Sequence, residues 1–265
     1  MQQGRITIND LEELKNLQPP DWDDITVPHQ WYVGSPNCSP FKWTINDNIC
    51  GIGTIIYHED TAWLAHIIVH ADHRNKGLGR IITQGLVDRV DRSKYQTIYL
   101  IATDLGYPVY QKVGFELEGI YSHFSTNDKL VTQLPNSILP YSEEYLEEVL
   151  MLDRQVSGEG RQHKLQLHLE DAVVFKSDDK IEGAFLPNLL NGLIIANNPE
   201  AGVELMKLRL QTVNYAICPA ENEIATAFLL QHNFEQVRIS RRMRIGAARE
   251  WQPAGLYNRI SGQLG

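Results

Sequence analysis

Hydrophobic and polar positions alternate along residues 41–69 in a manner that is typical of β-strands. Three strand-like runs follow one another closely, with only short polar breaks near residues 47 and 60: Phe41–Asn46, Cys50–His58 and Ala62–Val69. Short breaks between such runs favour hairpins, so this stretch predicts an antiparallel meander. Residues 18–40, which precede it, are rich in Pro, Asp, Asn and aromatic side chains and predict a long loop with at most one short helix.

The hydrophobic period changes after Gly77. Apolar residues then recur every three or four positions with polar residues between them, which predicts an amphipathic helix. A short apolar run at 97–103 predicts a buried strand. Pro108–Val113 predicts a short helix that ends at Gly114, and a further strand begins at Phe115.

The second half of the chain repeats this order less clearly. A helical pattern begins near Ser142 and a polar, proline-containing stretch at 122–141 precedes it. We therefore predict two related domains, residues 1–130 and 131–265. The later elements predicted in the second domain are strands at 172–175, 192–196 and 213–220, a helix at 202–210, a helix after residue 220 and a strand from Phe234.

The composition is ordinary for a globular protein with a core, at 43% hydrophobic and 22% charged residues. The longest apolar run, Ala65 to Val69, is interrupted by His66 and is far shorter than the roughly 20 residues of a membrane-spanning helix. The first ten residues carry no secretion signal. We expect a cytoplasmic protein with no membrane partner.

Charge and cysteine content exclude further classes of function. A formal net charge of −9 argues against nucleic-acid binding, which requires clustered Lys and Arg, and mildly favours a cationic substrate. Cys38, Cys50 and Cys218 are far apart, which excludes a disulfide framework and a thiolate zinc site. His66, His70 and His73 lack the spacing of metal ligands on a helix, so we expect no metal.

The most informative segment joins the third predicted strand to the amphipathic helix. It contains the run Arg74-Asn75-Lys76-Gly77-Leu78-Gly79, followed by Arg80. The glycines allow a close approach of the backbone, while the helix dipole and the basic side chains favour an anion such as a pyrophosphate. The alternative interpretation is a flexible glycine turn with exposed basic residues.

Two other phosphate-binding motifs do not fit this segment. A dinucleotide-binding fold has a third glycine where this chain has Ile82, and the P-loop has a Gly-Lys-Ser/Thr sequence that is absent here. An antiparallel meander also conflicts with the parallel sheet of a nucleotide-binding fold.

The segment closely resembles the GCN5-related N-acetyltransferase (GNAT) family. Its members have an Arg/Gln-x-x-Gly-x-Gly/Ala loop that holds the coenzyme A pyrophosphate, and the run from Arg74 to Gly79 matches it at each defined position. The resemblance implies that the backbone of Ile67, Ile68 and Val69 binds the pantetheine amides. It also implies acetyl-CoA as the co-substrate.

A second motif of the family is a helix that ends in Tyr-x-x-x-Gly-Phe, and Tyr110, Gly114 and Phe115 reproduce it. The resemblance implies that the Tyr110 phenol protonates the departing thiolate or donates a hydrogen bond to it, which agrees with the weak acidity of phenols. The alternative is that Tyr110 only packs its helix against the sheet. Many members carry Asn seven positions before this tyrosine, where it contacts the coenzyme; this chain has Thr103 there, and the resemblance implies the same contact for Thr103.

The general base is less clearly indicated. An acceptor amine must lose a proton, and the candidates are Glu59 and the adjacent Asp60, which close the preceding strand, and His66 within the next strand. Strict alternation places His66 on one face with Leu64 and Ile68, opposite Ile67 and Val69. Glu59 can equally be a turn residue and His66 a buried core histidine.

The second half resembles the C-terminal domain of the YitH-type subgroup, in the runs LDRQVSGEGR (152–161), NFEQVRISRRMRIG (233–246) and LYNRISGQLG (256–265). Its counterpart of the pyrophosphate loop, at 196–206, lacks the Arg and the Gly-x-Gly and contains Pro199 and Glu200. Leu229 or Leu230 stands where the catalytic tyrosine is expected. We predict a degenerate domain that binds no coenzyme in the usual way.

The resemblance implies an α+β (α/β) fold with two GNAT domains in tandem. Each has a mixed, mostly antiparallel sheet that is splayed between its fourth and fifth strands and flanked by helices. The implied function is transfer of an acetyl group from acetyl-CoA to a primary amine by direct attack, with a small-molecule or protein amine as acceptor. A catalytically silent acyl-CoA-binding regulatory module is the alternative, and a homodimer is compatible with the sequence.

Overall fold

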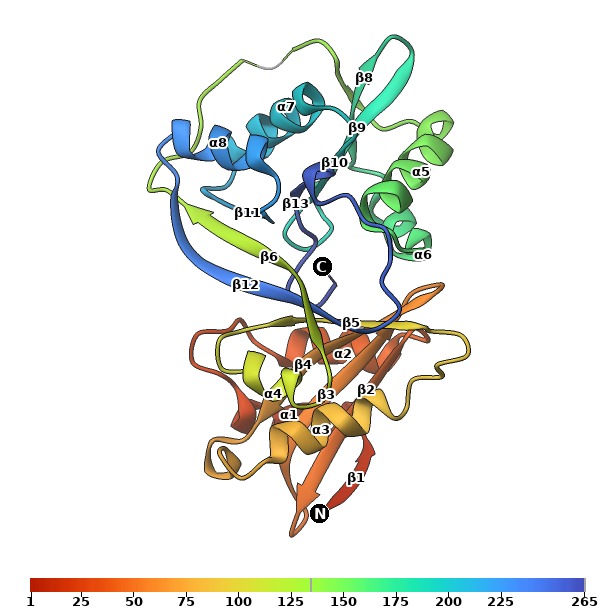
Figure 1. Ribbon diagram of the computed structural model, residues 1–265, viewed down its shortest axis with the longest axis vertical. Coiled ribbons are helices and arrows are strands. Elements are labelled where there is room, and N and C mark those ends of the chain that lie inside the picture. Colours follow the sequence, from red (N-terminus) through yellow and green to blue (C-terminus); the bar gives the residue numbers. More distant parts are fainter. Residues whose placement is uncertain (134, 265) are drawn as a thin grey trace. The chain divides into compact units, whose positions relative to one another are not determined.

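The computed structural model describes residues 1–133 and 135–264, which form two compact units (Figure 1). The first unit comprises Met1–Glu116 together with Met243–Ala247 and Gly262–Leu264, and the second comprises Leu117–Arg242 and Ala248–Ser261. Each unit therefore contains residues from more than one stretch of the chain. The domain ranges 1–130 and 131–265 stay a prediction, since these units are defined by packing alone.

The sheet of the first unit has the order β1-β2-β3-β4-β5, and the last residues of β12 lie beside β5. Neighbouring strands from β1 to β4 are antiparallel, which confirms the predicted meander, whereas β4 and β5 are parallel. The strands are β1 (Gln2–Arg5), β2 (Cys38–Ile45), β3 (Asn48–Tyr57), β4 (Thr61–Val69), β5 (Thr97–Ala102) and β12 (Glu235–Gly246).

Helices cover both faces of this sheet. On one face Ile82 and Leu86 of α3 pack in a buried cluster with Leu64 and Leu100. On the other face a second cluster joins the α1–α2 region to residues of β3 and β4. The helices are α1 (Leu11–Leu14), α2 (Thr26–Gly34), α3 (Leu78–Val87) and α4 (Tyr107–Gln111), with 3-10 turns at Ile8–Asp10, Lys15–Leu17 and Ala71–His73.

The second unit contains an antiparallel five-stranded sheet with the order β13-β10-β9-β8-β7. Separately, β6 pairs with β11, and the first part of β12 lies on its other side. The strands are β6 (Glu116–Ser125), β7 (Ile138–Pro140), β8 (Val173–Ser177), β9 (Lys180–Leu186), β10 (Leu193–Ala196), β11 (Tyr215–Pro219) and β13 (Leu256–Asn258).

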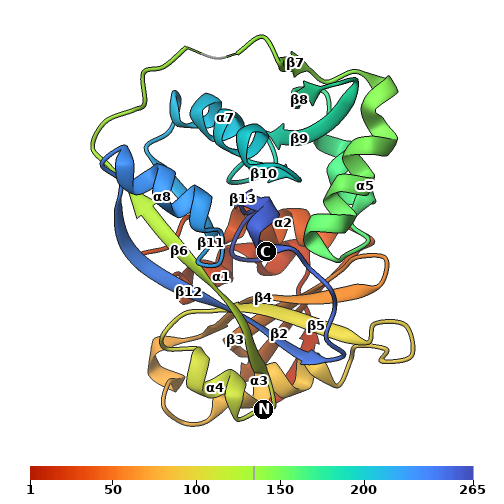
Figure 2. The same ribbon diagram turned by 45° about the horizontal axis from the view of Figure 1, so that its top comes forward.

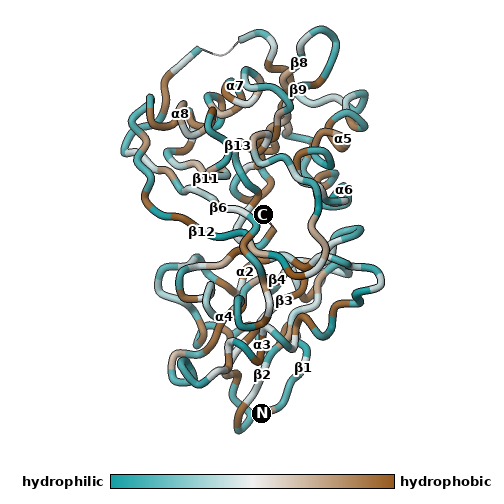
Figure 3. The backbone as a smooth tube through the Cα atoms, in the orientation of Figure 1, coloured by the Kyte–Doolittle hydropathy of each residue, from teal (hydrophilic) through white to brown (hydrophobic). Residues whose placement is uncertain are grey.

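Helices α5 to α8 belong to the second unit, and Figure 2 shows α7 beside β10 and α5 near β9. They are α5 (Leu146–Ser157), α6 (Gln162–Leu165), α7 (Pro199–Leu210) and α8 (Glu223–Gln231), with 3-10 turns at Glu143–Tyr145, Gln166–His168 and Pro253–Gly255. The β8–β9 hairpin is hydrophilic at its tip (Figure 3). Among the described residues, no helix combines the length and the apolar character needed to cross a membrane.

Candidate functional site

The two parallel strands of the first unit separate after three residue pairs. β4 pairs with β5 from Thr61 to Trp63, opposite Thr97 to Tyr99, and no pair between these strands follows within the described residues. The predicted splay between the fourth and fifth strands is therefore confirmed. Unpaired backbone amides and carbonyls of an internal strand require other partners, so this edge of β4 can bind an extended ligand that carries amide groups.

A β-bulge lies in β4 at the splay. Ile52 of β3 pairs with Ile68, whereas Thr54 pairs with Ala65, so two residues of β4 oppose one residue of β3. The bulged residue His66 has a φ of 47°, a backbone angle that residues other than Gly, Asn and Asp seldom adopt. Strain of this kind is concentrated at functional sites in proteins.

The bulge reverses the faces of β4. Leu64, Ile67 and Val69 all contact the cluster on the α3 side, whereas Ile68 belongs to the cluster on the α1–α2 side. The strict alternation that we predicted, with Leu64 and Ile68 on one face, is therefore wrong. The added residue shifts the period by one, and the apolar pattern of the strand contains no sign of it.

The predicted pyrophosphate loop forms the start of α3. Gly77 has a φ of 81° and precedes the first helical residue, and only glycine adopts this conformation without strain. The amides of Gly77, Leu78 and Gly79 have no acceptor in the described part of the chain. Orphan amides at the start of a helix bind anions, because the helix dipole is positive there.

The side chains of this loop are exposed, apart from Leu78, which is buried in the core, and Gly79, which is half-buried. Arg74 Nε donates to the carbonyl of Val69 at 3.1 Å and so ties the loop to the end of β4. Lys76 Nζ donates to the carbonyl of Asp72 at 2.7 Å, and Asn75 has a left-handed φ of 61°. With Arg80 the loop therefore presents three exposed cations around the orphan amides.

The helix that carries Tyr110 reaches the same place. A Cβ atom built on Gly79 would lie 3.8 Å from Val69 and 3.6 Å from Val109, so α3, β4 and α4 converge there. The Tyr110 ring packs 6.3 Å from that of Phe115. Burial raises the pKa of Tyr110 to about 12, so its phenol keeps its proton at neutral pH.

Thr103 follows β5 and begins the turn into α4. Its carbonyl accepts hydrogen bonds from the amides of Gly106 and Tyr107 at 3.1 and 2.9 Å, and its hydroxyl accepts from Gly106 at 3.3 Å. These bonds form the turn that leads into α4, whose N-cap is Gly106. Its contact with a coenzyme stays a prediction.

His66 lies in a cluster of rings from the α1–α2 region. The Tyr32 hydroxyl is 2.9 Å from His66 Nδ1, and the rings of His29, Tyr32 and Trp22 lie 5.3, 5.6 and 5.9 Å from the imidazole. Our sequence analysis missed these three partners. The sequence indicated these residues only through the aromatic content of residues 18–40. Because that stretch was predicted as a loop, it has no regular period from which contacts can be inferred.

The electrostatics of this cluster keep both imidazoles neutral. Burial, with a smaller effect of neighbouring His29, lowers the pKa of His66 to about 3. Burial also lowers the pKa of His29, whose Nδ1 bonds to the carbonyl of Ile25 at 2.7 Å. Burial raises the pKa of Tyr32 well above its ordinary value. The cluster therefore holds a neutral imidazole with one nitrogen fixed by a phenol.

Glu59 does not join this group. It is exposed in the turn between β3 and β4 with Asp60, and seven residues separate it from His66. Along an extended strand this corresponds to roughly 20 Å. Among the described residues no group of three or more His, Cys, Asp or Glu side chains is arranged to hold a metal ion.

The equivalent position in the second unit is built differently. The Asn198 side chain accepts the amide of Ala201 at 2.9 Å at the start of α7, and Pro199 has no amide to donate. Leu229 is fully buried in the core where a tyrosine would be expected. That no coenzyme pyrophosphate binds here stays a prediction.

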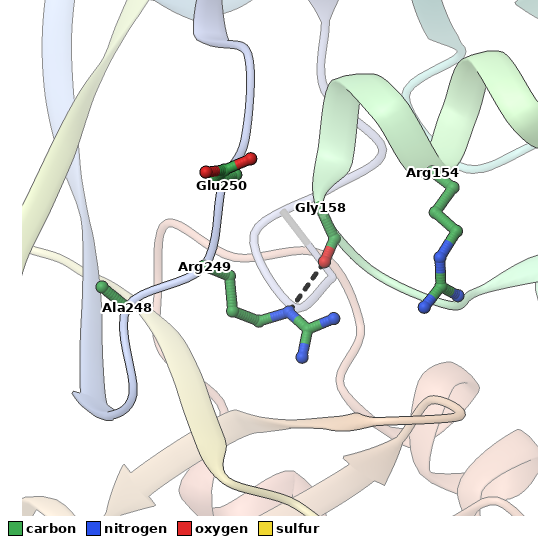
Figure 4. Close-up of a pocket in the computed structure, with 5 residues that line it drawn as sticks. All are labelled: Arg154, Gly158, Ala248, Arg249 and Glu250. Carbon is green, nitrogen blue, oxygen red and sulfur yellow. Dashed lines mark hydrogen bonds between the residues drawn. The ribbon is translucent and has the colours of Figure 1, made fainter.

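The second unit also has an open hollow of about 380 Å³, lined by Arg154, Gly158, Ala248, Arg249 and Glu250 (Figure 4). Arg249 Nε donates to the carbonyl of Gly158 at 2.7 Å, which joins the two sides of the hollow. Its lining offers no nucleophile. None of the predicted catalytic or coenzyme-binding residues lines it.

Comparison with protein families supports this description of the first unit. Residues 8–115, which are less than half of the chain, match the model of the acetyltransferase (GNAT) family. The match includes β4, the loop after it and Tyr110. Among curated proteins, none matches this chain.

Solved structures show the fold over the whole length of the chain. A protein from Pyrococcus horikoshii that is described as a candidate acetyltransferase is 18% identical, with a TM-score of 0.82 over 100% of this chain and 95% of that one. A tandem GNAT protein of the clavulanic acid biosynthesis pathway is 13% identical, with a TM-score of 0.62 over 94% and 99% of the two chains. The predicted tandem GNAT fold is therefore confirmed. The YitH-type subgroup stays a prediction.

Proposed function

We propose that the protein is an N-acetyltransferase that transfers an acetyl group from acetyl-CoA to a primary amine. The observation that carries the proposal is the start of α3, where orphan amides beside Gly77 adjoin the unpaired edge of β4. One place thus offers an anion site and a row of unpaired peptide groups. Coenzyme A has both matching parts, a pyrophosphate and an arm with two amides.

Each part of the coenzyme has a counterpart in the first unit. The amides at 77–79 and the cations Arg74, Lys76 and Arg80 would hold the pyrophosphate. The backbone of Ile67, Ile68 and Val69 would pair with the arm as an added strand does. This path leads from the loop towards the bulge, so the thioester would lie near His66.

The reaction follows from this placement. The amine nitrogen attacks the thioester carbonyl carbon, a C–N bond forms and the C–S bond breaks with its electron pair on sulfur. The amine reacts in its neutral form, the free nitrogen of His66 accepts a hydrogen bond from it, and the proton that the amine loses passes to solvent. Tyr110 donates a hydrogen bond to the departing sulfur. Since its pKa of about 12 exceeds that of an ordinary thiol, near 8.5, the sulfur takes its proton from solvent.

His66 is better placed than Glu59 to contact the amine. It lies in the bulge beside the splay, and Tyr32 fixes its Nδ1 so that the opposite nitrogen has a defined direction. With Nδ1–H donating to the Tyr32 oxygen, the other nitrogen of the neutral imidazole keeps its lone pair and accepts a hydrogen bond from the amine. Glu59 lies at the far end of the same strand.

The acceptor is proposed only as a class. The net charge of −9 favours a cationic amine, and both a small molecule and a protein amino group meet that condition. A cytoplasmic location is part of the proposal, since acetyl-CoA and its amine acceptor must meet there.

The proposal is tested by release of free thiol from acetyl-CoA across a panel of polyamines, amino acids, aminoglycosides and peptides. We expect amine-dependent release of thiol that His66→Phe lowers about tenfold, because it removes the acceptor of one hydrogen bond, worth roughly 1.5 kcal/mol. His168→Phe, in the second unit, is the matched control and should keep full activity. Tight binding of acetyl-CoA without turnover on any acceptor would contradict the proposal and favour a silent binding module.

A further inference from the structure

The two units differ in what lies between the strands that flank the coenzyme position. In both, a strand, a helix, a second strand and a second helix follow in sequence: β4-α3-β5-α4 in the first and β10-α7-β11-α8 in the second. In the first unit β4 and β5 diverge and leave an unpaired edge. In the second unit β13 lies between β10 and β11 (Figures 1 and 2).

Backbone hydrogen bonds hold this segment on both sides. On one side β13 pairs antiparallel with β10, where Asn258 pairs with Ile194 and Leu256 with Ile195. On the other side the amide of Arg259 donates to the carbonyl of Ile217 in β11 at 3.0 Å. The segment therefore uses the edge of β10 that would otherwise be unpaired.

The side chain of Asn258 completes the contact with β11. Its Oδ1 accepts the amide of Ile217 at 2.9 Å, and its Nδ2 donates to the carbonyls of Asn191 and Gly192 at 3.0 and 2.6 Å. One buried amide thus joins β11 to the turn before β10. The Asn258 side chain is buried, so without these partners its polar atoms would be left without hydrogen bonds.

Tyr257 fills the space beneath α7. Its ring is buried, and a Cβ atom built on Gly202 of α7 would overlap the ring. Asn222, at the start of α8, donates from Nδ2 to the carbonyl of Leu256 at 3.1 Å. The segment therefore contacts both helices and both strands that surround the coenzyme position of this unit.

We propose that β13 is an internal occupant of the second unit's coenzyme position, where the chain's own peptide groups take the place of a coenzyme arm. The second unit is then closed to acyl-CoA by a segment that belongs to the same chain. Occupation by β13 excludes the coenzyme independently of the loss of the loop residues that would bind pyrophosphate. A strand that is covalently linked to the site competes with any ligand at a high effective concentration. The chain should bind one coenzyme molecule.

Calorimetric titration of the full chain with coenzyme A measures this number. We expect one molecule per chain, and none in Gly77→Val, which disrupts only the first site. Two molecules per chain, or one that remains in Gly77→Val, would overturn the inference. If coenzyme A did not bind to the unaltered chain, this would contradict the proposed function. The inference about β13 would then be decided by the thermal-unfolding experiment described next.

The second experiment tests, without any ligand, whether the Tyr257 ring packs against Gly202 of α7. Gly202→Ala should lower the midpoint of thermal unfolding by several degrees, because the added methyl group displaces the ring. In a Tyr257→Ala background the same change should cause no loss, since alanine is favoured over glycine within a helix. Gly34→Ala, which adds a methyl group in open space, is the control. Equal losses from Gly202→Ala in both backgrounds would overturn the inference.

Discussion

Replacement of Tyr110 by phenylalanine removes a single hydroxyl from the place where the leaving thiolate is proposed to form. The ring itself is held by its surroundings. A Cβ atom built on Gly106 would lie 2.7 Å from Tyr110 Cε2, and Phe115 packs on the ring from the side. Phenylalanine keeps these contacts, so the midpoint of thermal unfolding should not change.

The expected loss of activity follows from the state of the phenol. Burial raises its pKa to about 12, so it remains a neutral donor over the working pH range and stabilises charge on sulfur by one hydrogen bond. Removal of one such preorganised donor typically lowers kcat by about 10²–10³, or about 2.7–4 kcal/mol. The same raised pKa predicts that no loss of rate from ionisation of Tyr110 occurs below about pH 11.

The assay is thiol release under saturating acetyl-CoA, measured as kcat and KM for the best acceptor. Tyr107→Phe is the matched control, since Tyr107 lies one turn earlier in α4 and accepts a hydrogen bond from Gln111 at 3.2 Å. It should keep kcat. A Tyr110→Phe enzyme with kcat within about threefold of the unaltered chain would refute a leaving-group role and leave Tyr110 as a packing residue.

Three further outcomes are expected. Gly77→Ala should raise the Kd for coenzyme A about tenfold in calorimetry while Gly34→Ala does not, because a left-handed φ costs about 1–2 kcal/mol for alanine; equal affinities would contradict this. Arg161→Ala should reduce the free energy of unfolding by about 3–5 kcal/mol in denaturant titration, since it leaves buried Asp153 unpaired, whereas a change below 1 kcal/mol would count against a buried ion pair. The free energy of unfolding should fall as pH is lowered from 6.5 towards 3, because in this range His66 binds its proton only in the unfolded chain. His66→Phe should reduce the slope of the free energy of unfolding against pH by the amount that corresponds to about one proton. An unchanged slope would contradict a buried neutral imidazole.

The loop and the helix of Tyr110 could be predicted from the sequence because their chemistry is local. A left-handed residue before a helix requires glycine, and Gly77 stands at that position with basic residues around it. The amphipathic pattern after it also fixes the buried face of α3, on which Ile82 and Leu86 lie. Such features depend on residues that are neighbours in the chain.

The acceptor side of the site could not be predicted because it depends on contacts across the fold. Tyr32 and His66 are 34 residues apart, and no spacing rule connects a residue of a proline-rich loop with a strand. The bulge at His66 adds to the difficulty, since it changes the face of each later residue of β4 without any Gly or Pro to mark it. The predicted alternation failed for this reason.

The occupant of the second unit was hidden for a related reason. The missing glycines and Pro199 indicated that the second loop is degenerate, but nothing in the run at 256–258 marks it as a strand between β10 and β11. Three residues are too few for a hydrophobic period. Their partners lie some 40 to 60 positions earlier in the chain.

Acetyl-CoA with an isotopic label in the acetyl group provides the most direct test of the proposed transfer. The full chain is incubated with the labelled donor and the best acceptor amine, and the protein, free thiol and amine product are analysed by mass spectrometry. Direct attack predicts equal amounts of free thiol and labelled N-acetylated amine, with no label on the protein at any time. Thiol release without a labelled amine, or label that passes first through the protein, would contradict the account.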